Sequence, residues 1–199
     1  MSETDAKKTS KNTGGFTVTE EIEHYSPFNL NAFKEWLSIL LLAFCIVYLV
    51  NTYVIVNANV PTGSMIPTIN PEEKIIASRF AYHTTSPERG DVVIFRYPDN
   101  EEILYVKRVI GLPGDEVLIK DGNVYINGVK LEEPYVKKET KGNFGPYEVP
   151  EGCYFMLGDN RNNSEDSRFW HNKFVSEEKI LGKVVIKYNI IPPYVQKIK

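Results

Sequence analysis

Ser64 is the first residue of this chain whose setting favours nucleophilic chemistry. It lies in Pro61-Thr62-Gly63-Ser64-Met65-Ile66-Pro67, where two prolines and a glycine bracket the serine. Prolines restrict the backbone on both sides, so the segment disfavours a helix and has stiff ends that can hold one side chain in place. It is not the G-x-S-x-G elbow, because residue 62 is threonine and residue 66 is isoleucine. From the local sequence alone, an incidental serine in a plain loop is the simpler interpretation.

A serine hydroxyl is a weak nucleophile, so Ser64 needs a base nearby. His83 and His171 are the conventional candidates, but each lies in a polar stretch where exposure is expected. They leave a Ser-His-Asp triad open without supporting it. Together with His24 they also lack the spacing of a metal site, and there is no H-E-x-x-H. The sequence therefore predicts neither a metal site nor a cofactor.

Lys107 is a different kind of candidate base. It lies within Ile103–Ile110, a β-like run whose alternation places Tyr105, Lys107 and Val109 on one face. Apolar neighbours favour desolvation, which disfavours the ammonium and lowers the pKa until the amine can accept a proton. An edge-strand lysine in water is the commoner outcome for this residue type. The spacing alone does not decide between the two.

A third polar segment, Gly158–Arg168, is dense in short hydrogen-bonding side chains. Such a composition is typical of surface loops built from Asx turns, so alone it assigns no chemistry.

An apolar segment precedes all these residues. Trp36–Val56 comprises 21 residues, and no charged residue occurs between Trp36 and Pro71. A helix of this length measures about 31 Å, enough to span a bilayer. A buried core helix would show a polar face, and a cleavable signal peptide would not follow a long net-acidic stretch. Val56-Asn57-Ala58 is nevertheless a passable cleavage trio, so processing at Ala58 stays open.

Beyond residue 72 the sequence predicts an antiparallel β-rich domain. Asp121-Gly122 and Asn127-Gly128 are hairpin signals, and Ser176–Lys179 is expected to form a brief helical turn. The predicted strands are Lys74–Arg79, Asp91–Tyr97, Ile103–Gly111, Asp115–Lys120, Asn123–Ile126, Tyr154–Leu157 and Lys183–Tyr188. The predicted fold class is thus mainly β, with one N-terminal transmembrane helix. The net charge of −3 and the absence of a basic stripe argue against a nucleic-acid partner.

Four segments resemble, in this order, the signature boxes of bacterial type I signal peptidases. They are Gly63–Ile69, Arg89–Val93, Tyr105–Gly111 and Gly158–Arg168. Each box is weak alone, but four in order after a transmembrane run are highly specific. The short connection between residues 111 and 158 resembles the compact Gram-positive forms, which nearly lack an accessory β domain.

The resemblance implies a Ser-Lys serine endopeptidase that removes N-terminal signal peptides from exported preproteins. It implies that Ser64 is the nucleophile and Lys107 the general base, and no cofactor is expected. Ser164 matches the serine that hydrogen-bonds the lysine, and Thr62 matches an oxyanion-hole hydroxyl. The remaining matched residues are expected to support the site: Asp166, Arg168, Asp159 and Arg108. The substrate pocket is expected to involve Met65, Tyr105 and Val106. Asn162 replaces an aspartate of some relatives, at a position without a catalytic role.

The positive charges beside the apolar run do not predict its orientation, because Lys34 before it balances Lys74 after it. The expected orientation therefore comes from the resemblance. Residues 1–35 are expected to form a cytoplasmic tail and 36–56 the helix in the cell membrane. Residues 57–199 are expected to form an extracytoplasmic catalytic domain of the signal peptidase type. The expected partners are signal peptides of secreted preproteins and the lipid bilayer, with the secretion machinery as a further candidate.

Two alternatives remain beside this interpretation. One is a Ser-Lys autoprotease like the self-cleaving SOS repressors, but those are soluble. The other is a non-catalytic, signal-peptidase-like membrane protein acting in pilus assembly or binding. Such a protein is expected to lack the nucleophile or the base, whereas Ser64, Lys107 and Ser164 are all present.

Overall fold

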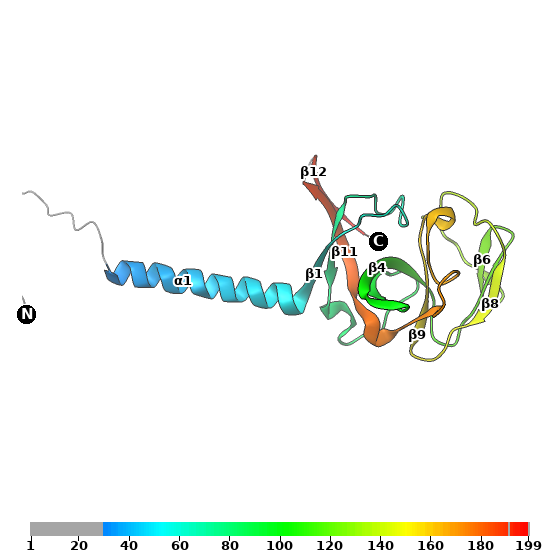
Figure 1. The fold of residues 1–199 in the computed structure, drawn as a ribbon, viewed down its shortest axis with the longest axis horizontal. Coiled ribbons are helices and arrows are strands. Elements are labelled where there is room, and N and C mark those ends of the chain that lie inside the picture. The colour runs from blue at the N-terminus through cyan, green and yellow to red at the C-terminus, as the bar shows by residue number, and fades with distance from the viewer. Residues whose placement is uncertain (1–29, 191, 199) are drawn as a thin grey trace, which may run out of the picture. The chain divides into compact units, whose positions relative to one another are not determined.

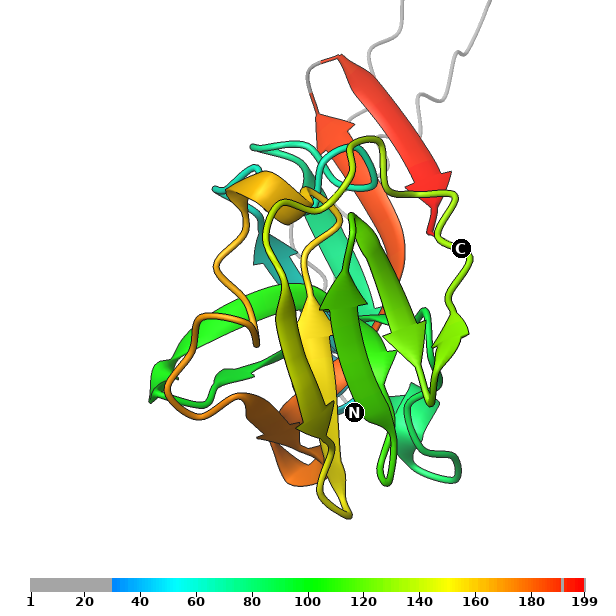
Figure 2. The ribbon, with the colours of Figure 1, turned by 90° about the vertical axis from the view of Figure 1, so that its right-hand side faces the viewer.

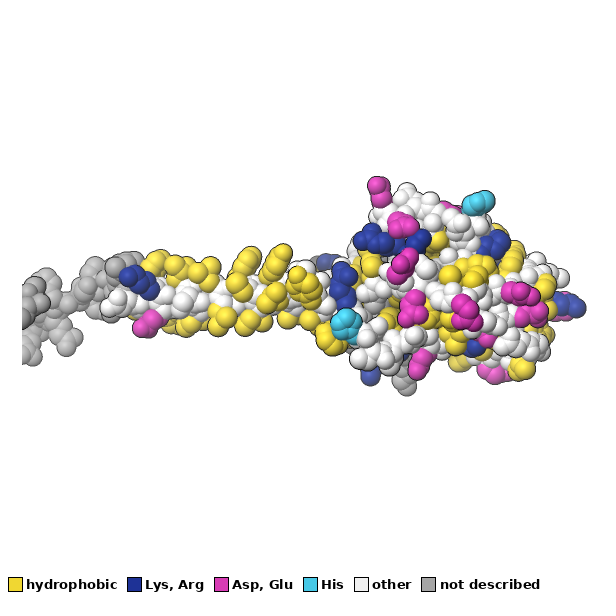
Figure 3. Space-filling view, turned by 90° about the horizontal axis from the view of Figure 1, so that it is seen from below, with side chains coloured by type: hydrophobic (Ala, Val, Ile, Leu, Met, Phe, Trp, Pro, Cys, Tyr) yellow, Lys and Arg dark blue, Asp and Glu magenta, His cyan; other side chains and the backbone are white. Residues whose placement is uncertain are grey.

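The computed structural model describes residues 30–190 and 192–198, which begin with an apolar helix. Helix α1 (Leu30–Leu49) continues as a π-helical segment, η1 (Val50–Val54), before strand β1 (Ile55–Asn59) (Figure 1). The helical stretch Asn31–Val54 has 24 residues and is long and apolar enough to cross a membrane. Hydrophobic side chains cover much of its visible surface (Figure 3), as expected of a helix that faces lipid.

The helix differs in its bounds from the predicted 36–56. It begins at Leu30 and its helical part ends at Val54, because Ile55 and Val56 already pair with β2 as a strand. Both residues are β-branched, which favours strand over helix where a partner strand is available. Residues 1–29 of the predicted cytoplasmic tail lie outside the described residues.

The first sheet is antiparallel and has eight strands, in the order β1-β2-β11-β3-β4-β9-β10, with β12 paired to β11. In Figure 1, β11 runs through the middle of this sheet, between the end that carries β1 and the end that carries β9. The bounds beyond β1 are β2 (Lys74–Ser78), β3 (Val92–Tyr97), β4 (Asn100–Gly111), β9 (Cys153–Leu157), β10 (Phe174–Ser176), β11 (Ile180–Ile190) and β12 (Pro193–Lys197). Short 3-10 turns occur at η2 (Phe80–Tyr82), η3 (Arg161–Asn163) and η4 (Glu177–Lys179).

The second sheet is smaller and is inserted between β4 and β9. Its order is β7-β6-β5-β8, and Figure 2 shows these strands side by side. The bounds are β5 (Glu116–Lys120), β6 (Asn123–Ile126), β7 (Val129–Lys130) and β8 (Phe144–Glu148). Both predicted hairpin turns are present, and Asp121 and Asn127 adopt positive φ angles of 49° and 52°. Asp and Asn tolerate this conformation better than other non-glycine residues.

Three hydrophobic clusters hold the domain together. One lies around β1, β2 and β11, and a second packs β3, β4 and β9 against Trp170. The third joins the sheets, where Ile110 and Phe155 of the first meet Val117 and Ile119 of the second. The prediction of an apolar N-terminal helix followed by a mainly antiparallel β domain is confirmed.

Strand β4 is the element that most directly builds the site. Its residues Leu104–Arg108 pair with β3 on one side, whereas β9 pairs only with Arg108–Gly111 on the other. The first half of β4 therefore has one backbone edge free of β9.

Candidate active site

Ser64 lies in the loop that joins β1 to β2. Two backbone hydrogen bonds close this loop at its base, from Val60 N–H to Glu73 O at 3.1 Å and from Glu72 N–H to Val60 O at 2.9 Å. At its tip, Asn160 donates from its backbone to Ser64 O at 3.0 Å and from its side chain to Gly63 O at 2.9 Å. Asn160, which is distant in sequence, thus holds the backbone of Gly63 and Ser64 in place.

Lys107 lies opposite Ser64, in the middle of β4. Its Nζ is 2.7 Å from Ser64 Oγ, and the two residues are only 4% and 7% exposed. The ring of Tyr105, on the same face of β4, lies 5.2 Å from the Lys107 Nζ. The sequence left the environment of this lysine open, and the structure places it in the interior.

Burial lowers the pKa of Lys107 from its ordinary 10.5 to about 8. The carboxylates of Asp166, Glu165 and Asp159 raise it back in part, and Arg168 lowers it slightly. Desolvation outweighs the carboxylates, so an appreciable fraction of the lysine is an uncharged amine near neutral pH. An uncharged amine beside a serine hydroxyl can accept its proton.

Ser164 and Gly158 complete the immediate surroundings of Ser64. A Cβ on Gly158 would lie 2.2 Å from Ser164 Oγ and 2.6 Å from Ser64 O, so only glycine fits between them. Ser164 is 8% exposed, and its Oγ has no hydrogen-bond partner among the described residues. The hydrogen bond to Lys107 that the resemblance implies is therefore not formed in this structure.

Thr62 lies on the open side of Ser64. Its Oγ1 is 3.4 Å from Ser64 Oγ, at the long end of hydrogen-bond distance, and its side chain is exposed. The hydroxyl can therefore face a molecule that approaches the serine from solvent.

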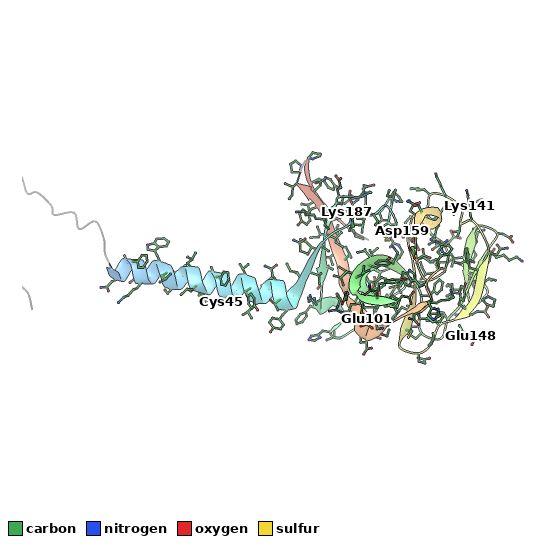
Figure 4. The ribbon with its side chains drawn as sticks, in the orientation of Figure 1. Cys45, Glu101, Lys141, Glu148, Asp159 and Lys187 are labelled. Atoms are coloured by element: carbon green, nitrogen blue, oxygen red, sulfur yellow. The ribbon has the colours of Figure 1, made fainter. Side chains whose placement is uncertain are left out.

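The four charged residues expected to support the site form two buried ion pairs behind it. Arg108 binds Asp159 through two bonds, from Nε at 2.9 Å and Nη2 at 2.7 Å, and Thr68 also donates to Asp159. Figure 4 labels Asp159, which lies just after β9. Arg168 binds Asp166 in the same bidentate way, at 2.7 and 2.9 Å. The first pair links β4 to the segment after β9, whereas the second lies within that segment, and no hydrogen bond links either pair directly to Ser64 or Lys107 within the described residues.

Three further residues, which the sequence did not predict, form polar contacts next to these buried ion pairs: Arg161, Glu133 and Tyr135. Arg161 binds Glu133 at 2.8 and 2.5 Å and donates from Nε to Gly158 O at 3.0 Å. Tyr135 donates to Glu133 at 2.9 Å, and Arg108 lies 3.9 Å above its ring. Burial raises the pKa of Tyr135 well above its ordinary value, so its hydroxyl remains a donor. The sequence signal was Glu133-Pro134-Tyr135, a carboxylate and an aromatic fixed by a proline.

A groove of about 440 Å³ opens in front of Ser64 and Lys107. One wall is the segment 59–64 and the other is Ile103–Lys107 of β4, with Asn163 and Glu165 at the end. Tyr105 and Val106 line it, as expected from the sequence. Met65 does not line it: its side chain is fully buried in the β1–β2–β11 cluster, because the turn after Ser64 directs it inward. Neither His83 nor His171 lines the groove, and both are exposed.

Comparison with known proteins gives a consistent result. The family model described as "Signal peptidase, peptidase S26" matches residues 33–189. A probable signal peptidase I-2 of Synechocystis sp. is 40% identical over 148 residues, which are 72% of this chain and 67% of that protein. Signal peptidase I of Bacillus licheniformis is 38% identical over 156 residues, 73% of this chain and 83% of that protein. Among solved structures, signal peptidase I of Enterococcus faecalis V583 is 37% identical and covers 50% of this chain and 97% of its own, with a TM-score of 0.44.

Proposed function

This chain belongs to the signal peptidase family, peptidase S26, and we propose that Ser64 is its nucleophile and Lys107 its general base. Its activity is that of a membrane-anchored serine endopeptidase acting on the signal peptides of preproteins. The observation that carries the residue assignment is the buried 2.7 Å contact between Lys107 Nζ and Ser64 Oγ. This contact, with a lysine pKa of about 8, supports a serine activated by an amine.

In the first half of the reaction, Ser64 Oγ attacks the scissile carbonyl carbon while its proton passes to the neutral amine of Lys107. The tetrahedral intermediate then collapses, and the Lys107 ammonium returns that proton to the leaving amine. In the second half, Lys107 takes a proton from water, the hydroxide attacks the acyl ester, and Ser64 Oγ recovers the proton. This sequence is the Ser-Lys form of the logic of serine-protease triads.

Stabilisation of the oxyanion falls to Thr62 and to the Ser64 backbone N–H. The Thr62 hydroxyl lines the groove with its Oγ1 3.4 Å from Ser64 Oγ. Donors aimed at the developing negative charge act strongly in a site shielded from water. Losing one such donor typically reduces the rate by about 10²–10³-fold.

The free edge of β4 gives the substrate a place to bind in an extended conformation. Residues 103–107 line the groove and are not paired with β9. An extended peptide can add to such an edge through backbone hydrogen bonds, which hold it independently of its side chains. Val106 and Tyr105 then lie where the side chains nearest the scissile bond would be accommodated.

The topology of the chain follows as part of the proposal. The apolar helix spans the cell membrane, the residues before it lie in the cytoplasm, and the β domain lies on the outer side. Strand β1 begins at Ile55, directly after the helix ends at Val54, so this domain is tethered without a linker. The lipid bilayer is thereby a partner, and the secretion machinery that delivers preproteins is a further one. Protease added to intact protoplasts should digest the β domain, whereas its protection would reverse the topology.

The residue assignment is tested with the full-length protein in detergent and a preprotein that carries an Ala-x-Ala cleavage site. Ser64→Ala and Lys107→Ala should each abolish cleavage while the circular dichroism spectrum stays that of the wild type. His83→Ala is the matched control and should cleave normally. Loss of activity in His83→Ala with retention in Lys107→Ala would assign the base to the histidine instead.

A further inference from the structure

Glu165 is the one acidic residue, and Lys107 the one basic residue, among the described residues that line the groove. Its side chain is exposed, and it forms no ion pair within the described part of the chain. The neighbouring carboxylates differ, because Asp159 and Asp166 are each bound by an arginine behind the site. Glu165 thus presents an unneutralised carboxylate to whatever occupies the groove.

Tyr105 provides a second feature of the same part of the groove. One face of its ring stacks on Tyr97 with 4.6 Å between the centroids and 7° between the planes, and Trp170 packs at 5.8 Å. The ring is therefore fixed in position. Burial raises the pKa of Tyr105, and the charges of Glu165 and Asp99 raise it further.

The charge balance of the groove depends on the state of Lys107. In the form that can accept a proton, Lys107 is neutral, and Glu165 then leaves the groove with a net negative charge. A carboxylate on the lining of this groove is a favourable environment for an ammonium or guanidinium group, and the fixed Tyr105 ring is a rigid part of the same lining.

We propose that Glu165, together with Tyr105, forms a subsite beside the scissile bond that prefers a lysine or arginine side chain of the preprotein. The placement follows from the groove lining, which Glu165 shares with Ser64 and Lys107, and from the preceding residue Ser164, which lies against Gly158 as the Ser64 backbone oxygen does. The inference rests on the proposed function, since it places the scissile bond at Ser64. Because Glu165 is exposed, the preference of Lys over Glu in kcat/KM is about 3- to 10-fold and falls with rising salt.

The test uses full-length wild type and Glu165→Gln in detergent with substrates that differ at one residue. Lys, Gln or Glu is placed in turn at each position from the third before the cleavage site to the second after it. At one position the wild type should prefer Lys over Glu, and Glu165→Gln should reduce the ratio to about 1. Glu165→Lys should invert the ratio. Taking the ratio within each variant cancels the effect of the lost charge on the Lys107 pKa, which Asp159, Asp166 and Arg168 also set.

Glu102→Gln is the matched control, because Glu102 is an exposed glutamate of β4 outside the groove lining. It should keep the wild-type ratio at every position. The subsite is overturned if the wild type shows no Lys preference anywhere, or if Glu165→Gln retains it. Failure of the proposed function looks different: Ser64→Ala would still cleave the Gln substrates.

Discussion

Lys107 and Arg108 are consecutive cations of β4 with opposite surroundings. Both are buried, at 4% and 3% exposure. Lys107 faces the groove, where Ser64 Oγ is its hydrogen-bond partner and no carboxylate contacts it among the described residues. Arg108 faces the interior behind the groove, where Asp159 binds it through two hydrogen bonds and the Tyr135 ring lies 3.9 Å away.

The difference shows how one strand provides both a base and a fixed charge. Burial without an ionic partner disfavours the charged form, and the pKa of Lys107 falls to about 8. Burial with a bidentate carboxylate keeps a guanidinium charged and fixes its position. Changes at Lys107 should therefore act on catalysis, whereas changes around Arg108 should act first on stability.

The largest expected effect is on activity, in Lys107→Arg. A guanidinium stays protonated at any working pH and cannot take the Ser64 proton, so kcat/KM should fall at least about 10³-fold. Preprotein cleavage followed over hours measures the residual rate. Arg108→Lys is the control exchange in the reverse direction, and it should keep measurable activity because it leaves the base intact. Substantial activity in Lys107→Arg would mean that residue 107 acts as a fixed cation.

The second effect is on stability, in Asp159→Asn. This change leaves the Arg108 guanidinium buried without its carboxylate, which costs about 3–5 kcal/mol in the free energy of unfolding. For a domain of about 150 residues that corresponds to a fall in Tm of roughly 6–20 °C. Calorimetry of the detergent-solubilised protein measures it. Asp121→Asn is the control, because the exposed Asp121 carboxylate forms no hydrogen bond or ion pair within the described residues, and its loss should move the Tm much less. Equal shifts in the two variants would contradict the structural role of the pair.

The third effect is the pH dependence of the wild type. Because the folded pKa of Lys107 lies below its ordinary 10.5, the amine form is lost as the pH falls through about 8. Below that value kcat/KM should drop about tenfold per pH unit, and above it the rate should level off. A histidine base would place the same limb near 6.5. Initial rates between pH 5 and 10 with one preprotein distinguish the two, and a plateau that extends down to pH 7 would exclude Lys107 as the base.

The fold was predictable from the sequence where local signals were strong. The strands expected around Lys74–Arg79 and Asn123–Ile126 formed, as did both turn dipeptides, because alternation and glycine turns act locally. Strand β8 was missed because it contains Gly145-Pro146, which favours a turn rather than a strand. Strand β1 was missed because its residues continue the apolar run of the helix, and only pairing with β2 separates the two.

The site was predictable only in part. The sequence placed Ser64 and Lys107 together through a resemblance, and the distance of 2.7 Å agrees with that placement. It could not show that Met65 is buried, because the direction of a loop side chain depends on tertiary packing. The sequence also did not predict the ion pair between Arg161 and Glu133, because these two residues are 28 positions apart in the chain. The catalytic roles of Ser64 and Lys107 and the supporting roles of their neighbours stay predictions until the variants are measured.

The smallest effect in this series is expected in Glu133→Gln. This change extends the comparison of buried cations from Lys107 and Arg108 to Arg161, the ion-pair partner of Glu133. Glu133 neutralises Arg161, which in turn holds Gly158 O next to Ser64 and Ser164. Its side chain is 9% exposed, so water offsets part of the loss, and the free energy of unfolding should fall by about 1–3 kcal/mol.

Glu132→Gln is the matched control, because Glu132 is the exposed neighbour in sequence and should leave the Tm within about 1 °C. If Arg161 also positions Gly158, Glu133→Gln should lower kcat several-fold at a temperature where it is fully folded, while KM changes little. Tyr135→Phe, which removes only the hydrogen bond to Glu133, should show the same direction to a lesser degree. A loss of stability with unchanged kcat would restrict these residues to holding the fold, and Lys107 would then depend on its own burial alone.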